Sequence, residues 1–123
     1  MPVPILKQGD YLIASIQGAL SDTEVLELRD ELTERIGRLR SRGIIVDVAA
    51  MDVIDSFVAR SLRTIALTAK LRGAETVIVG IQPDVAVAMV HFELNLEPLH
   101  TALDLEEVLV LLNRLIGGAP DGR

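Results

Sequence analysis

The stretch that decides the fold reads Ile44-Ile45-Val46-Asp47-Val48-Ala49-Ala50-Met51-Asp52-Val53-Ile54-Asp55-Ser56 and continues as Phe57-Val58-Ala59-Arg60-Ser61-Leu62. Its first part is a run of β-branched apolar residues, and its last part has the apolar spacing of a helix. Ser56 therefore stands where a strand gives way to a helix, with its hydroxyl at the helix N-terminus. In α/β domains, the residues that bind ligands usually follow the carboxyl ends of the strands.

Ser56 has two interpretations. Serine and aspartate are preferred helix N-caps, because their side-chain oxygen accepts a hydrogen bond from an unpaired amide of the first turn. A cap alone would not require the carboxylates of Asp52 and Asp55 beside the same loop. The second interpretation is that Ser56 is a regulated hydroxyl.

The segments on either side alternate between strand and helix patterns. Residues 3–7 and 11–16 form two β-like runs around a short turn, which predicts a hairpin. A capping box at Ser21 and Glu24 opens a helix, for which Gly43 supplies a left-handed stop. A second buried strand is predicted over residues 74–81, after the helix that begins near Ser56 and stops at Gly73.

The last third of the chain predicts two further helices. Pro83 suits the first turn of a short helix that runs to about His91. A weakly extended stretch over residues 99–101 precedes a capping box at Asp104 and Glu107, which opens a helix through Ile116. This order predicts one α/β domain over residues 1–117: a mixed, mostly parallel sheet with an opening hairpin, about four packed helices and a flexible tail at 118–123.

Composition narrows the possible functions. The chain has 123 residues, a formal net charge of −6 and no cysteine. The acidic balance argues against a nucleic-acid or anionic-membrane surface, and the lack of cysteine excludes disulfides. No apolar run reaches the length of a membrane span, and no leader pattern opens the chain, so we expect a cytoplasmic protein. Because the mean hydropathy of +0.39 is high for a small domain, we also expect self-association or a stable protein partner.

Few residues could support catalysis. His91 and His100 are the only histidines, and neither has the spacing of a metal site or a catalytic triad. The sequence has no glycine-rich phosphate loop, and Asp47, Asp52 and Asp55 are a weak signal for a divalent ion. A phosphate-accepting receiver domain would need a lysine after a late strand, which is absent. We therefore expect a non-enzymatic protein without a cofactor or metal.

The element order, the strand Ile44–Val48 and the sequence Ile54-Asp55-Ser56 together resemble the STAS domain of bacterial anti-anti-sigma factors. The resemblance covers nearly the whole chain, and residues 80–83 resemble the family's turn beside its phosphorylation loop. It implies that Ser56 is phosphorylated by a serine kinase and that Asp55 is its acidic neighbour. By position, Asp52, Phe57 and Arg60 are the remaining candidate residues of this loop.

One departure points to a branch of this family. Simple anti-anti-sigma factors usually continue with glycines after the serine, whereas this chain continues Phe57-Val58-Ala59-Arg60. Ile54-Asp55-Ser56-Phe57 resembles the RsbS-type proteins of the stressosome. This resemblance implies large mixed assemblies with RsbR-type STAS paralogues, an RsbT-type serine kinase that is released on phosphorylation, and a phosphatase for Ser56. The alternative is a simple anti-anti-sigma factor that binds an anti-sigma kinase directly.

Overall fold

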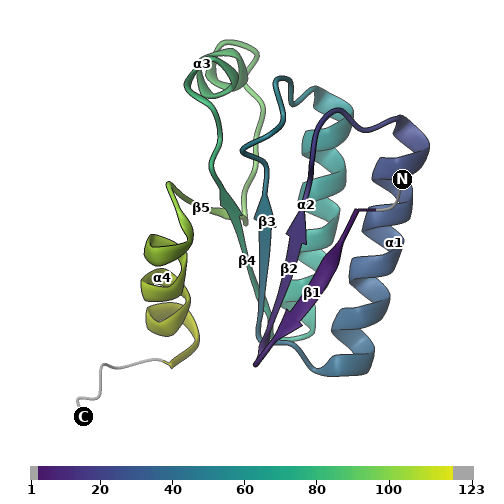
Figure 1. Cartoon of the computed structure of the whole chain (residues 1–123), viewed down its shortest axis with the longest axis vertical. Coiled ribbons are helices and arrows are strands. Elements are labelled where there is room, and N and C mark those ends of the chain that lie inside the picture. Colours follow the sequence, from purple (N-terminus) through teal and green to yellow (C-terminus); the bar gives the residue numbers. More distant parts are fainter. Residues whose placement is uncertain (1–2, 118–123) are drawn as a thin grey trace.

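The computed structural model describes residues 3–117 (Figure 1), so the tail predicted over residues 118–123 lies outside the described residues. Nine elements follow one another along the chain: β1 (Ile5–Gln8), β2 (Tyr11–Ser15), α1 (Asp22–Leu39), β3 (Gly43–Asp47), α2 (Ser56–Leu71), β4 (Glu75–Val79), α3 (Pro83–His91), β5 (His100–Ala102) and α4 (Leu105–Gly117). The predicted hairpin, the two buried strands and the four helices are all present. None of the described helices is long and apolar enough to cross a membrane.

The five strands form one mixed sheet in the order β1-β2-β3-β4-β5. β1 and β2 pair antiparallel as the opening hairpin, and each later strand pairs parallel to the one before it. Ser15, Asp47 and Val79 lie side by side in the register, so β2, β3 and β4 end at the same edge of the sheet. The loops that follow these strands therefore lie close together.

α1, α2 and α4 cover the two faces of the sheet, whereas α3 lies beyond the end of β4 (Figure 1). α1 and α2 pack against each other on one face, and α4 packs against β3, β4 and β5 on the other. Side chains of β3 alternate between the two layers: Ile44 and Val46 join the core beneath α1 and α2, as does Val48 just after the strand, whereas Ile45 joins the core beneath α4. The prediction of a strand buried on both faces is confirmed.

Of the two predicted helix C-termini, the one at Gly73 is confirmed and the one at Gly43 is wrong. The Ser21–Glu24 capping box is present, with both of its hydrogen bonds. α1 ends at Leu39, and its C-cap Arg40 takes the left-handed conformation with φ 52°, so the prediction that Gly43 stops this helix was wrong. α2 is followed by Gly73 at φ +84°, as the sequence predicted.

Gly43 is required for packing rather than for a turn. It is the first residue of β3, and a Cβ there would lie 2.9 Å from Cδ1 of Tyr11 and 3.1 Å from Cδ1 of Leu112. Cβ contacts this short force the neighbouring atoms to shift. The missing side chain therefore lets α4 approach the start of the strand closely.

Candidate functional site

Ser56 is the first residue of α2, and its side chain is exposed. The N-cap is Asp55, whose Oδ1 accepts a hydrogen bond from the backbone N–H of Val58 at 2.8 Å. The interpretation of Ser56 as the cap was therefore wrong. Within residues 3–117 the Ser56 hydroxyl forms no hydrogen bond, so the fold does not use it.

The loop between β3 and α2 is held by its own backbone and by buried side chains. The Asp47 carboxylate accepts a hydrogen bond from Ala49 N–H at 2.9 Å, and Met51 N–H donates to the carbonyl of Val48. Met51 and Ile54 are buried, whereas Asp52 and Val53 between them are exposed. The loop is therefore anchored at both ends and presents its middle to solvent.

A second loop, after β4, lies against the first. The side-chain amide of Gln82 donates to the carbonyl of Ala49 at 2.7 Å. Gly80, at φ +82°, also approaches Ala49: a Cβ on this glycine would lie 3.0 Å from the Ala49 Cβ. Because glycine adopts positive φ without strain, this position favours it for two reasons. The expected closeness of residues 80–83 to the serine loop is confirmed.

A cavity of about 480 Å³ opens between the Ser56 loop and α3. It is lined by Asp52, Val53, Ile54, Asp55, Ser56, Asp84, Val85, Ala88, Phe92 and Leu94. The lining combines apolar side chains with three carboxylates, and Phe92 is 71% exposed despite its size. A concave apolar surface with few charged groups is the kind of site into which a protein partner inserts an anchoring side chain.

The structure brings together some of the predicted site residues and separates others. Asp52, Asp55 and Ser56 share the cavity wall. Phe57 turns inward and packs against the core beneath α1 and α2. Arg60 lies one turn further along α2 with its side chain exposed, and in the described part of the chain its guanidinium forms no ion pair.

The cavity residues from α3 and its C-cap were missed by sequence reasoning. Asp84 and Phe92 line the cavity with the serine loop, but they are about thirty residues away in the sequence. Pro83 correctly marked the start of α3, and the resemblance of residues 80–83 placed that start near the loop. A third carboxylate and an exposed aromatic ring could have been added to the site from this signal.

The three aspartates considered for a divalent ion do not form a ligand set. Among the described residues, no group of three or more histidine or acidic side chains could hold a metal ion. One oxygen of Asp47 is engaged with Ala49 N–H, and one oxygen of Asp55 with Val58 N–H. These carboxylates therefore shape the loop and its helix cap.

Comparison with known proteins agrees with this architecture. The family model for the STAS domain matches residues 3–108. A solved structure of a serine-to-glutamate variant of RsbS from Moorella thermoacetica is 36% identical, with a TM-score of 0.79, and the match covers 92% of this chain and 96% of that one. A chain from a structure of the stressosome, described as a signal integration and transduction hub, is 35% identical with a TM-score of 0.72, and the match covers 91% and 97% of the two chains.

More distant relatives share the fold or part of the sequence. The unphosphorylated anti-sigma factor antagonist SpoIIAA is 13% identical with a TM-score of 0.69, over 91% of this chain and 97% of that one, which shows the fold alone. The RsbT co-antagonist protein RsbRD of Bacillus subtilis is 24% identical over 110 residues, or 89% of this chain. The chain spans only 40% of the length of that relative. From the family match and the RsbS likeness over nearly its whole length, the chain belongs to the STAS domain family as an RsbS-like member.

Proposed function

We propose that this protein is a non-catalytic scaffold and phosphoswitch of a bacterial stressosome. In this proposal it binds an RsbT-type serine kinase while Ser56 is unmodified, and it releases the kinase once Ser56 is phosphorylated. The observation that carries the proposal is the exposed Ser56 hydroxyl, unused by the fold, at the wall of a cavity that can receive an anchoring side chain of a partner. A hydroxyl with no structural role can be modified without unfolding the domain.

A phosphate on Ser56 would change the charge of the cavity wall more than its shape. The group adds about −1.5 to −2 charges at neutral pH. The N-terminus of α2 stabilises this charge, whereas Asp52, Asp55 and Asp84 in the same wall repel it. Because these charges remain in contact with water in the free protein, the domain should tolerate the modification.

Binding of the kinase removes the water around these charges. Phosphorylation should therefore lower the affinity for the kinase more than the stability of the domain. A phosphate desolvated in an interface without a cationic partner is costly, and like charges across an interface oppose association. The kinase side chains that fit three carboxylates of the unmodified wall would be cationic, and the apolar floor of Ile54, Val85 and Phe92 would receive an apolar anchor. A bulky phosphate beside this floor blocks the approach of the anchor.

The assembly part of the proposal rests on the stressosome relatives and on the surface of the chain. Several large apolar side chains outside the cavity are exposed, and they are Leu6, Leu67, Leu71, Val87, Val90, Leu103, Leu105, Leu109 and Val110. Exposed apolar patches are typical of proteins that associate. We propose self-association, assembly with RsbR-type paralogues in the cytoplasm, and a phosphatase that resets Ser56.

The alternative, a simple anti-anti-sigma factor that binds an anti-sigma kinase directly, shares the same phosphorylated serine. The solved RsbS variant is 36% identical to this chain, compared with 13% for SpoIIAA, which favours the stressosome proposal. The two differ in particle size. Co-expression with an RsbR-type paralogue should give a particle far larger than a dimer, whereas a chain that stays monomeric would support the alternative.

The first test of the switch is the site of phosphorylation. The chain is incubated with ATP, magnesium and the RsbT-type kinase of the same organism, and intact and peptide masses are measured. The expected product carries one phosphate on Ser56, and Ser56→Ala carries none. Thr64→Ala is the matched control, because Thr64 is an exposed hydroxyl two turns further along α2 and its loss should leave phosphorylation unchanged.

The second test is kinase affinity. Ser56→Glu should weaken kinase binding at least about tenfold, which corresponds to roughly 1.4 kcal/mol. Thr64→Glu places the same charge on the same helix away from the cavity, and it should bind as the unmodified chain does. Equal affinity of Ser56→Glu and the unmodified chain would refute the release mechanism, even if Ser56 is phosphorylated.

A further inference from the structure

β1 is an edge strand whose outer side pairs with no other described strand. In an antiparallel pair, residues alternate between those whose backbone groups face the partner and those whose groups face outward. Ser15 N–H donates to the carbonyl of Pro4, so Pro4 and Leu6 face β2. Ile5 and Lys7 therefore direct their backbone N–H and C=O groups to the open edge.

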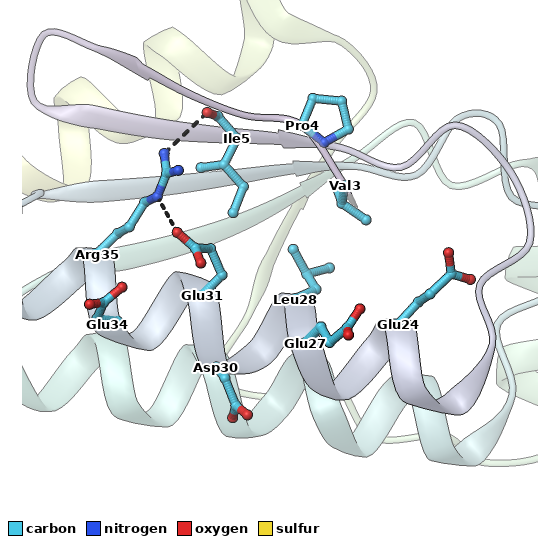
Figure 2. Close-up of a pocket in the computed structure, with 10 residues that line it drawn as sticks. All are labelled: Val3, Pro4, Ile5, Glu24, Glu27, Leu28, Asp30, Glu31, Glu34 and Arg35. Atoms are coloured by element: carbon cyan, nitrogen blue, oxygen red, sulfur yellow. Dashed lines mark hydrogen bonds and ion pairs between the residues drawn. The ribbon is translucent and has the colours of Figure 1, made fainter. Parts of the chain in front are cut away.

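A groove of about 900 Å³ runs along this edge, between β1 and α1. In Figure 2 the side chains of Val3 and Ile5 point from the strand toward Leu28 of the helix and form an apolar floor. Leu28 is 5% exposed. The groove therefore offers unpaired strand backbone to an extended chain, and its apolar floor can pack the aliphatic stem of a long side chain.

The helix wall of the groove is strongly acidic. Its lining includes five carboxylates and one guanidinium, and these residues are Glu24, Glu27, Asp30, Glu31, Glu34 and Arg35. Glu31 and Glu34 form ion pairs with arginines of the same helix, whereas Glu27 forms none within residues 3–117. Asp30 points away from the strand in Figure 2. An occupant with cationic side chains on its helix-facing side would complement this wall.

Arg35 closes one backbone position of the edge. Its Nη1 donates to the outward carbonyl of Ile5 at 3.2 Å, while its Nε donates to Glu31 at 2.7 Å (Figure 2). The side chain therefore takes the place that the N–H of a neighbouring strand would occupy. Charged side chains often cover exposed strand edges in this way, and this one must move aside before another strand can pair with the Ile5 carbonyl.

We propose that this groove binds an extended segment of a partner protein, which adds a strand to β1 and alternates cationic with apolar residues. The backbone of the segment pairs with Ile5 and Lys7, and its cationic side chains face Glu27 and Glu31. Its apolar side chains lie on the opposite face of the sheet, beside Leu6, which is 60% exposed. In strand addition, backbone pairing supplies affinity and alternate side chains supply specificity.

A second copy of this chain fits the groove poorly. Two copies that paired through β1 would bring the same acidic α1 walls against each other. Like charges in an interface are unfavourable, so charge complementarity selects a different chain. The groove is also separate from the Ser56 cavity, since the two share no lining residue. The proposal therefore stands independently of the phosphoswitch.

The test uses a capped heptapeptide of alternating lysine and valine, titrated into the full chain and followed by amide chemical shifts. The expected shifts fall on Ile5, Lys7 and the first three turns of α1. Two control peptides separate strand addition from general charge attraction: one has the same composition in separate lysine and valine blocks, and one is N-methylated on alternate residues. Both should bind at least about tenfold more weakly, because strand pairing supplies much of the affinity.

Three variants of the chain make the test specific. Glu27→Lys should weaken binding by roughly twofold to fivefold, the upper part of the range for one exposed charge pair. Glu106→Lys, an exposed glutamate on α4, should leave it unchanged. Arg35→Met frees the Ile5 carbonyl and removes a repelling charge, so it should tighten binding.

Other results would overturn the proposal. These are the absence of shifts in β1 and α1, equal binding of the blocked or N-methylated peptide, and equal effects of Glu27→Lys and Glu106→Lys. Shifts that map to the Ser56 cavity would also refute it, because they would assign the peptide to the other site. The amide spectrum of each variant reports at the same time whether the variant is folded.

Discussion

The side-chain amide of Gln82 lies 2.7 Å from the carbonyl oxygen of Ala49, to which it donates a hydrogen bond. Gln82 is the N-cap residue of α3, and Ala49 begins the loop that leads to Ser56. This contact joins two loops that are more than thirty residues apart in the sequence. It fixes the position of α3, and thus of the cavity floor, relative to the serine loop.

Gln82→Ala should loosen the serine loop without unfolding the domain. Loss of one partly exposed hydrogen bond lowers the free energy of unfolding by about 0.5–1.5 kcal/mol. Amide exchange at Met51, whose N–H donates within the loop, should become faster. Phosphorylation of Ser56 should slow by roughly twofold to fivefold, because the kinase must order the loop as it binds.

Gln17→Ala is the control for this prediction. Gln17 is exposed, and in the described chain its side chain forms no hydrogen bond, so the same change of residue type removes no contact. If both variants slowed phosphorylation equally, the Gln82–Ala49 contact would have no part in presenting Ser56.

Asp55 should matter for stability, and Ser56 should not. Asp55→Ala removes the cap of α2 and should lower the free energy of unfolding by about 0.5–2 kcal/mol, measured by urea denaturation. Asp55→Asn keeps an oxygen for Val58 N–H and should recover most of this loss. Ser56→Ala should change stability by less than about 0.5 kcal/mol. A larger loss for Ser56→Ala would mean that its hydroxyl serves the fold.

Local signals in the sequence predicted most of the fold. The capping residues Ser21 and Asp104 precede their helices as expected. The predicted capping box at Asp104 is only half present, because the Glu107 carboxylate accepts a hydrogen bond from Leu103 N–H and not from Asp104 N–H. These signals act within one turn of backbone and need no tertiary information. The run Ile44–Val48 predicted burial on both faces, because it opens with three successive apolar residues and only a sheet covered on both faces buries all three.

Contacts between residues that are distant in the chain could not be predicted from the sequence. The Ser56 loop is continuous in the chain, so the sequence alone could place Asp52 and Asp55 beside Ser56, and all three line the cavity. Phe92 reaches the same cavity only through the packing of α3, which no local pattern specifies. For the same reason Gly43 was predicted to stop a helix and not to allow close packing. The atoms that exclude a side chain at this position belong to Tyr11 and Leu112, which are distant in the chain.

Gly43→Ala tests this packing role. The added Cβ would lie 2.9 Å from Tyr11 and 3.1 Å from Leu112, which are in different elements, so either the start of β3 or α4 must shift. We expect a loss of about 1–3 kcal/mol in the free energy of unfolding. Gly18→Ala is the control, because nothing lies within 4 Å of a Cβ there. If both substitutions cost the same, the effect would come from backbone freedom rather than from packing.

The ion-paired carboxylate of Glu75 should make stability depend on pH. Partial burial raises the pKa of this carboxyl, but hydrogen bonds from Lys70 at 3.0 Å and His100 at 3.1 Å outweigh it and hold the pKa below 4.5. A carboxyl whose pKa is lower in the folded state stabilises the fold above its unfolded pKa, and this contribution disappears as the pH falls through the folded pKa. Stability should therefore decline on acidification below about pH 4.5.

Glu75→Gln should remove this part of the pH dependence. The difference in unfolding free energy between the variant and the unmodified chain should be largest near neutral pH and should shrink on acidification below about pH 4.5, measured by urea denaturation at each pH. Lys70→Met removes one of the groups that lower the pKa of Glu75, so the loss should begin at a higher pH. A pH-independent difference for Glu75→Gln would mean that the carboxylate contributes through packing rather than through its charge.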